Sequence, residues 1–213
     1  MAVRGARKKV ADKEHYHHGD LRRALLDASL ELISKEGFAA LSLREVARRA
    51  GVTHAAPYRH FADKEALLAA VAEEGFRAMT ARMRQDMARE PTPMRRLMAC
   101  GVAYVLFAVE NAAHFRVMFG PHFTRPLAPS DAQEAGNSFL ILVDAILEAQ
   151  RAGEVHEGEP HALALTCWSL VHGLASLWVD RQLEYTGMSM GVETLAREQT
   201  RMLMRGLALT PID

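Results

Sequence analysis

The stretch Ser42–Lys64, which reads SLREVARRAGVTHAAPYRHFADK, constrains the fold more than any other part of the chain. Ser42 is followed three residues later by Glu45, which is the S-x-x-E pattern of a capping box at the start of a helix. Apolar residues at helical spacing come next, and Gly51 stands where a helix commonly ends in the left-handed conformation. The sequence therefore predicts a short helix whose two ends are both defined by local chemistry.

Two further helices are predicted directly after this one. Thr53 can cap a short helix that carries residues 54–60, and Asp63 can cap the helix that follows it. The middle helix contains His, Ala, Ala, Tyr and Arg, and it lacks the apolar stripe that a helix of ordinary structural hairpins shows. We therefore interpret the stretch as a helix-turn-helix whose second helix enters the major groove of DNA. A plain helical hairpin with a solvated basic face is the alternative.

The segments LRRALLDASLELISKEGF, LSLREVARRAGV and THAAPYRHFADKEALL, together with their spacing, resemble the DNA-binding domain of TetR-type (TetR/AcrR) transcriptional regulators. The resemblance covers residues from about 20 to 66. A weaker one lies at Trp168, His172 and Gly173, which are similar to the Trp-His-Gly signature of one subgroup of these regulators. The resemblance implies a larger C-terminal helical domain that binds an effector and forms a homodimer.

The whole chain reads as an all-α protein, because no strand-like alternation of apolar and polar residues is present. We expect a disordered basic arm at 1–18, a helix-turn-helix DNA-binding domain at 19–66, and an effector-binding and dimerisation domain at 67–213. Outside the helix-turn-helix, helices are expected at 20–36, 63–89, 93–111, 114–119, 131–152, 159–185 and 191–207, with a loop at 120–129.

The charge distribution agrees with a nucleic-acid partner for the N-terminal part. Residues 1–64 hold 13 Lys and Arg against 8 Asp and Glu, whereas residues 65–213 hold 13 against 18. Cys100 and Cys167 lie in apolar helical stretches and are interpreted as small buried hydrophobes in a reducing cytoplasm. No signal peptide is recognised, so we expect a cytoplasmic protein without a membrane partner.

The helix-turn-helix predicts which residues meet DNA. Thr53, His54, Ala55 and Ala56 occupy the first turn of the second helix, the part that approaches base edges. The resemblance implies a base or backbone contact for Arg44 and phosphate contacts for Tyr58, His60 and Lys64. Pro57 departs from the family pattern of Leu or Ile, and its missing N–H removes one intrahelical hydrogen bond.

The C-terminal half contains a helix, at 163–179, that is apolar on nearly all sides. Such a helix must be covered all round, so we expect it to pack against its own domain on one side and a second subunit on the other. A purely intramolecular core is the alternative. An effector pocket is implied by the resemblance, with lining residues that can equally be core residues: Phe107, His114, Phe115, Met118, Phe119, Trp168, His172 and Trp178.

These features together predict a dimeric, sequence-specific transcriptional regulator. It would bind double-stranded DNA at a palindromic operator and act as a repressor that a small apolar effector releases. An architectural DNA-binding protein without an effector is the main alternative. An enzyme is disfavoured because H-E-x-x-H, C-x-x-C and nucleophile-elbow motifs are absent from the sequence, so no cofactor and no catalytic or metal site is expected.

Overall fold

A computed structural model describes residues 18–121 and 129–207, and within these ranges every regular element is helical. The predicted all-α class is therefore confirmed. The arm at 1–18 and the loop at 120–129 fall almost entirely outside the described residues. The elements are α1 (His18–Glu36), η1 (Phe38–Ala40), α2 (Leu43–Arg49), η2 (Pro57–Arg59), α3 (Lys64–Met87), α4 (Pro93–Glu110), α5 (Ala112–Phe119), α6 (Pro129–Arg151), α7 (Pro160–Val179), η3 (Gln182–Thr186) and α8 (Val192–Leu207).

The chain divides into two compact units, Met1–Leu67 and Leu68–Asp213. In the first, α1 packs against η1 and α2, and α2 packs against η2. The core of this unit contains Leu41 and Phe61, whereas Phe38 is only half-buried. Phe38 begins a 3₁₀ turn after Gly37, and that turn contributes no buried residue.

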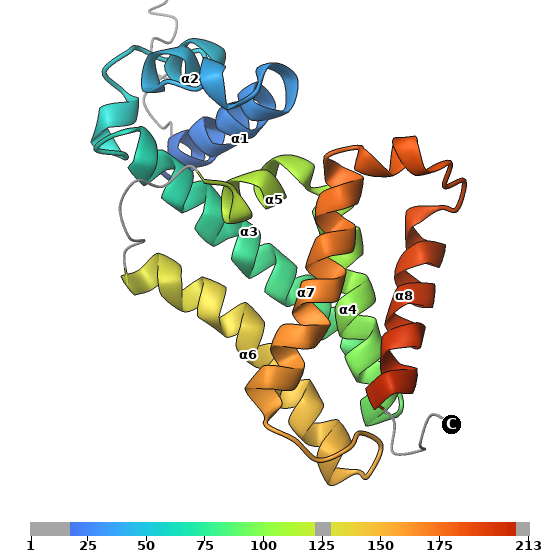
Figure 1. Cartoon of the computed structure of the whole chain (residues 1–213). Helices are drawn as coiled ribbons and strands as arrows, with labels where there is room; N and C mark the ends of the chain where they lie inside the picture. The colour runs from blue at the N-terminus through green and yellow to red at the C-terminus, as the bar shows by residue number, and fades with distance from the viewer. Residues whose placement is uncertain (1–17, 122–128, 208–213) are drawn as a thin grey trace, which may run out of the picture. The chain divides into compact units, whose positions relative to one another are not determined.

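In the second unit, α4 is the helix around which the others assemble (Figure 1). It packs against α5, α6, α7 and α8, and eight of its residues are buried. The helix starts at the Thr92 N-cap, whose hydroxyl accepts from the Arg95 N–H at 3.3 Å. A helix that is apolar on most sides is stable only when it is surrounded, and α4 meets this condition inside a single chain.

Helix α7 ends earlier than the sequence predicts. The expected helix at 159–185 stops at Val179, and Arg181 takes a left-handed conformation with φ 59° before the short turn η3. An arginine on α5 explains this end, since Arg116 Nη2 donates to the Val179 carbonyl at 2.5 Å and Arg116 Nε donates to Asp180 Oδ1 at 3.3 Å. The carbonyls at the end of a helix need such partners.

The rest of the described chain buries only part of helix α7. Among the described helices, α7 is the one that is long and apolar enough by itself to cross a membrane, and the sharply bent pair α4 and α5 passes the same test only if counted as one span. Inside the chain, 33% of the apolar window of α7 is buried. Leu165 and Leu177 remain 53% and 45% exposed, so this helix keeps an uncovered apolar face.

Close contact between α4, α7 and α8 depends on Gly101. A Cβ at this position would lie 2.9 Å from Thr200 Cγ2 and 3.2 Å from Val171 Cγ1. Both neighbours are β-branched and buried, and they cannot move aside as the end of a long side chain can. The absence of a side chain at Gly101 therefore sets the distance between the three helices.

We expect Gly101→Ala to destabilise the protein by about 1–3 kcal/mol, because overpacking outweighs the better helix propensity of alanine. Urea unfolding followed by circular dichroism measures this change. Thr200→Ser removes the methyl group in question and keeps the hydroxyl, so the double variant should recover stability relative to Gly101→Ala. If the two substitutions simply add, Gly101 does not set the contact.

Candidate functional site

The first helix of the helix-turn-helix begins as the capping pattern predicts. Ser42 Oγ accepts a hydrogen bond from the Glu45 N–H at 3.2 Å, and Ser42 itself is extended, with φ −144° and ψ 154°. The Glu45 carboxylate accepts from Arg48 Nε at 2.9 Å. This ion pair lowers the pKa of Glu45, so the carboxylate stays charged near the positive end of the α2 dipole.

The turn after α2 has the hydrogen bonds of a Schellman motif. Gly51, with φ 69°, donates its N–H to the Arg48 carbonyl at 3.2 Å, and the Val52 N–H reaches back to the Ala47 carbonyl at 3.0 Å. A side chain at position 51 would be strained in this conformation. The glycine therefore defines where α2 ends and where the following segment starts.

The second helix of the pair is shorter than the sequence predicts, and the expected helix over residues 54–60 is wrong in its length. Residues 54–55 form a turn, and η2 is a 3₁₀ turn that begins at Pro57. Proline has no N–H with which to continue the hydrogen bonds of an α-helix, and its ring would clash with the carbonyl of the residue four positions earlier. The chain regains an α-type bond only where the Phe61 N–H donates to the Pro57 carbonyl at 2.9 Å. Pro57 itself is buried, so it anchors the turn.

The predicted DNA-contacting side chains are mostly accessible. Tyr58 is 55% exposed, although tyrosine usually packs at least one ring face. Four of the other predicted DNA-contacting residues between positions 44 and 60 are exposed: Arg44, Thr53, His54 and Ala55. Two are half-buried: Ala56 and His60. This stretch of chain therefore presents a small, polar and aromatic surface.

Two residues at the start of α3 hold the segment in place. Asp63 Oδ1 accepts from the Ala66 N–H at 2.8 Å and caps the helix as predicted. Lys64 Nζ donates to the Phe38 carbonyl at 3.0 Å. The ammonium of Lys64 has three donors, so this bond leaves donor capacity for a phosphate.

The arginines of α2 differ in their partners. Arg48 pairs with Glu45, and Arg49 pairs with Glu31 at 3.4 Å and also with Glu36. Arg44 lies on the same helix, is exposed, and forms no ion pair with any residue that the structure describes. Its guanidinium therefore does not have to break a salt bridge before it meets another anion or a base edge.

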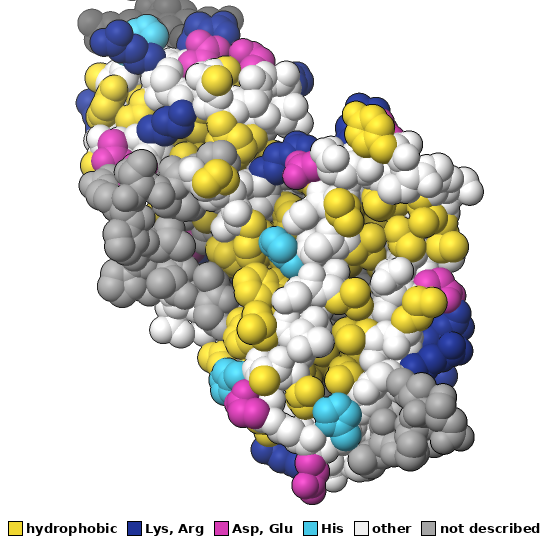
Figure 2. Space-filling model, in the orientation of Figure 1, with side chains coloured by type: hydrophobic (Ala, Val, Ile, Leu, Met, Phe, Trp, Pro, Cys, Tyr) yellow, Lys and Arg dark blue, Asp and Glu magenta, His cyan; other side chains and the backbone are white. Residues whose placement is uncertain are grey.

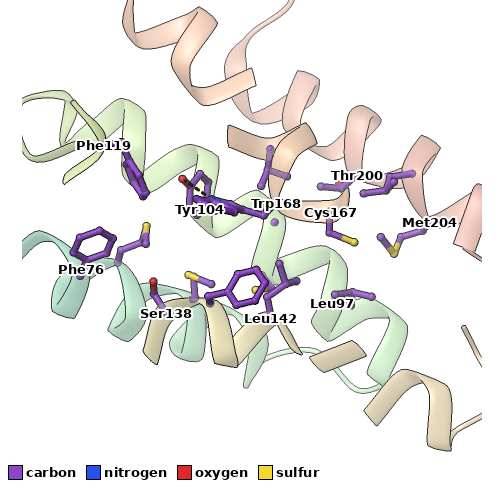
Figure 3. A pocket seen from close by; sticks show the side chains of 17 residues that line it. Phe76, Leu97, Tyr104, Phe119, Ser138, Leu142, Cys167, Trp168, Thr200 and Met204 are labelled. Atoms are coloured by element: carbon purple, nitrogen blue, oxygen red, sulfur yellow. Dashed lines mark hydrogen bonds between the residues drawn. The ribbon is translucent and has the colours of Figure 1, made fainter. Parts of the chain in front are cut away.

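The second unit contains an apolar cavity of about 140 Å³ (Figure 3). Side chains from α3 to α8 line it, and most of them are aliphatic, aromatic or sulfur-containing. They are Phe76, Met79, Met83, Leu97, Cys100, Gly101, Tyr104, Phe119, Ser138, Phe139, Leu142, Cys167, Trp168, Val171, Thr200, Leu203 and Met204.

The structure places the sequence-predicted pocket residues at different depths around this cavity. Phe119 and Trp168 line it, and their rings are 6.2 Å apart. Phe115 and His172 do not line it, but their ring centroids lie 5.0 and 4.8 Å from that of Phe119. The other four predicted residues are not among the lining side chains: Phe107 and Met118 are buried, and His114 and Trp178 are half-buried.

Tyr104 is a polar residue of the cavity lining that the sequence did not reveal as a pocket residue. Its hydroxyl lies 2.7 Å from His172 Nδ1 and accepts from Trp168 Nε1 at 3.2 Å, the latter bond being drawn in Figure 3. In the sequence, Tyr104 occurs within the apolar run of α4 and looks like a core residue. A buried tyrosine hydroxyl needs a hydrogen-bond partner, and His172 and Trp168, one helical turn apart on α7, both bond to this one.

The two cysteines also line the cavity, and both are free and buried. Burial raises the pKa of the Cys100 thiol to about 12 and that of the Cys167 thiol to about 11. Both thiols are therefore protonated at neutral pH and are weak nucleophiles. The described residues contain no group of three or more His, Cys, Asp or Glu side chains that could hold a metal ion.

Burial lowers the pKa of His172, so the unfolded chain takes up a proton at this residue before the folded protein does. Wild-type stability should therefore decrease as the pH falls below about 6.5, the ordinary value for histidine. We expect His172→Gln to reduce the dependence of Tm on pH between about pH 7 and 5, measured by thermal unfolding. The same change at the exposed His161 is the control, and equal slopes for His172→Gln and wild type would contradict this assignment.

Comparison with known proteins agrees with both halves of this description. The model of bacterial regulatory proteins of the tetR family matches residues 25–71, and that of the tetracyclin repressor-like C-terminal domain matches residues 97–203. A solved structure of a protein with unknown function from Rhodococcus sp. RHA1 is 34% identical, with a TM-score of 0.80, and the match covers 92% of this chain and 100% of that one.

Two curated relatives are transcriptional regulators. BetI of Rhizobium meliloti is 37% identical over 148 residues, which is 64% of this chain and 71% of the relative. The transcriptional repressor KstR of Mycolicibacterium smegmatis is 28% identical over 139 residues, and the match spans 65% of the length of each protein. With its N-terminal helix-turn-helix and its C-terminal helical domain both matched, this chain belongs to the TetR family of bacterial transcriptional regulators.

Proposed function

We propose that this protein is a homodimeric repressor that binds a palindromic DNA operator and leaves it when a small apolar effector occupies the cavity. The observation that carries the proposal is the pairing of a helix-turn-helix, exposed from Thr53 to Ala55, with an apolar cavity in the other unit. The KstR and BetI relatives are named as a repressor and a regulator, which supports the repressor role.

Different residues would supply the affinity and the specificity of operator binding. Lys64, Tyr58 and His60 would contact phosphates and fix the register of the helix pair on the duplex. Arg44 would contact a guanine or the backbone, and His54 would donate or accept at a base edge. Ala55 and Ala56 permit close approach and can contact a thymine methyl group. Because Pro57 shortens the second helix to a 3₁₀ turn, fewer side chains reach the bases, and DNA shape would supply part of the specificity.

Dimerisation would use the face of α7 that its own chain leaves uncovered. Hydrophobic side chains gather over the surface that α7 and α8 form (Figure 2). Leu165 and Leu177 lie on α7, and Met202, 61% exposed, lies on α8. Gly173, where an added Cβ would meet nothing within 4 Å, lies between the two leucines and would allow a second helix to approach closely. Two helices from each subunit would then form a four-helix interface whose twofold symmetry matches a palindrome.

Release by an effector would follow from a difference in affinity. A molecule in the cavity can shift the protein away from its DNA-binding state only by as much as it prefers the other state. Trp168 lines the cavity and His172 bonds to Tyr104, which also lines it. We propose that Trp168, His172 and Gly173 are the Trp-His-Gly signature of the subgroup, with the first two residues serving the cavity and the third serving the dimer face.

Arg44→Ala and Tyr58→Ala test the DNA-binding half of the proposal. Selection of bound fragments from a random DNA pool should yield a palindromic site with the wild-type protein. We expect Arg44→Ala to lose about 1–3 kcal/mol of binding free energy and to relax specificity at one base position. Tyr58→Ala should weaken binding to all sequences alike. Fluorescence anisotropy with the selected site measures both effects.

The control is Arg77→Ala, which removes an exposed arginine of the second unit that pairs with Glu73. It should bind the operator as wild type does. If no site is enriched and binding disappears at moderate salt, the protein is an architectural DNA-binding protein and not an operator-specific repressor.

Leu177→Arg tests the dimer face, with Leu140→Arg as a matched control. The two leucines are 45% and 46% exposed, but Leu140 lies on α6. A charge at position 177 should convert the dimer to a monomer, because a buried charge at an interface has no partner there. Light scattering coupled to size-exclusion chromatography measures the mass. Dissociation by both variants, or by neither, argues against α7 as the interface.

A further inference from the structure

We propose that the cavity selects a neutral, compact apolar molecule that carries one hydroxyl group, and that it rejects the carboxylate of the same skeleton. The inference rests on the proposed function only in taking this molecule to be the effector. It depends on three features of the lining: its size, the absence of a cation among its described side chains, and the hydrogen-bonding position that the Tyr104 hydroxyl offers.

The size of the cavity limits the ligand to one ring or a short chain. A cavity of about 140 Å³ is close to the ~150 Å³ of an engineered apolar protein cavity that binds benzene. Figure 3 shows Phe76 and Phe119 at one end of the space and Leu97 and Met204 toward the other. A ring of six carbons with a one-carbon substituent matches these dimensions.

The charge of the ligand is limited by the side chains that surround it. Among the residues that the structure describes, no Lys, Arg or His lines the cavity, and the carbon and sulfur atoms of the lining cannot replace the water around an anion. Moving a carboxylate into such a space without a paired cation costs several kcal/mol in proteins. An ionised acid would therefore be excluded, whereas the alcohol of the same skeleton loses only the hydration of one hydroxyl group.

The hydrogen-bonding groups of the lining are mostly in use. Thr200 Oγ1 donates to the Ala196 carbonyl of its own helix at 2.8 Å, and the Trp168 N–H is directed to Tyr104. The Tyr104 hydroxyl shares its second bond with His172 Nδ1. A phenolic oxygen with one N–H donor and one ring nitrogen beside it keeps capacity for one more partner.

A ligand hydroxyl fits that remaining position with either tautomer of His172. If Nδ1 is the acceptor, the Tyr104 O–H points to it, and the tyrosine oxygen accepts from the ligand. If Nδ1 carries the proton, it donates to the tyrosine oxygen, and the Tyr104 O–H is free to donate to the ligand. A hydroxyl group can do both, so an alcohol gains one hydrogen bond that a hydrocarbon of the same shape does not.

The test compares benzyl alcohol, toluene and benzoate, which share one carbon skeleton, by calorimetric titration of the full-length protein at pH 8. We expect benzyl alcohol to bind about five- to tenfold more tightly than toluene, the usual effect of one net hydrogen bond. Benzoate should show no binding at the same concentrations. Equal binding of benzoate and benzyl alcohol would overturn the proposal, and so would the absence of binding by all three compounds.

Tyr104→Phe assigns the preference to the tyrosine hydroxyl. In this variant the alcohol and toluene should bind equally, with the toluene affinity kept. Thr80→Val, which removes a buried hydroxyl outside the lining, should retain the wild-type difference. A preference for the alcohol that persists in Tyr104→Phe contradicts the assignment. If Tyr104→Phe does not fold, the three-compound series on the wild-type protein still decides the ligand class.

Operator release, measured separately with the selected DNA site, distinguishes failure of this inference from failure of the proposed function. Binding of benzyl alcohol in the expected order without release would leave the ligand class standing and contradict induction by the cavity. Release by benzoate with no response to benzyl alcohol would support a ligand-released repressor and contradict the ligand class proposed above.

Discussion

The close approach of α7 and α8 to α4 is the constraint on which the second unit depends. Gly101 allows this approach because its missing side chain leaves room for Thr200 and Val171. Tyr104, one turn further along α4, is thereby brought to the same cavity as Trp168. A wider spacing would separate the tyrosine hydroxyl from both of its partners on α7. The packing of three helices and the polarity of the cavity therefore have a common origin at one glycine.

The cavity combines an apolar wall with one internally bonded polar cluster. Tyr104, His172 and Trp168 satisfy one another, so the site can exist without a ligand and without an unpaired buried group at this position. Such a cluster costs little in stability and still leaves an oxygen that can recognise a hydroxyl. Selectivity of this kind depends on the absence of a positive charge among the described lining residues as much as on the hydrogen bond that Tyr104 offers.

Where local chemistry determines the structure, the sequence was sufficient to predict it. The caps at Ser42 and Asp63 and the left-handed Gly51 are readable because each depends on residues within a few positions. The length of the second helix of the pair could not be predicted in the same way. Proline at position 57 signals a lost hydrogen bond, but whether a kinked α-helix or a 3₁₀ turn results depends on how the ring packs.

The cavity was only partly predictable for the opposite reason. Phe119 and Trp168 are aromatic and stood out in the sequence, whereas Leu97, Met204 and Tyr104 had nothing to distinguish them from core residues. Which apolar residues border a space is decided by the relative positions of helices that are distant in the sequence. His172, one helical turn after Trp168, also stood out, but its partner Tyr104 on α4 lies 68 positions away in the sequence.

The end of α7 shows how far such non-local control extends. Its last carbonyl is held by Arg116, 63 residues earlier in the chain, and Arg181 adopts a backbone conformation that glycine or asparagine would adopt with less strain. The end of α7 therefore combines a local turn with contacts from a distant helix. A substitution at position 116, although it lies on α5, would therefore remove two hydrogen bonds from the end of α7.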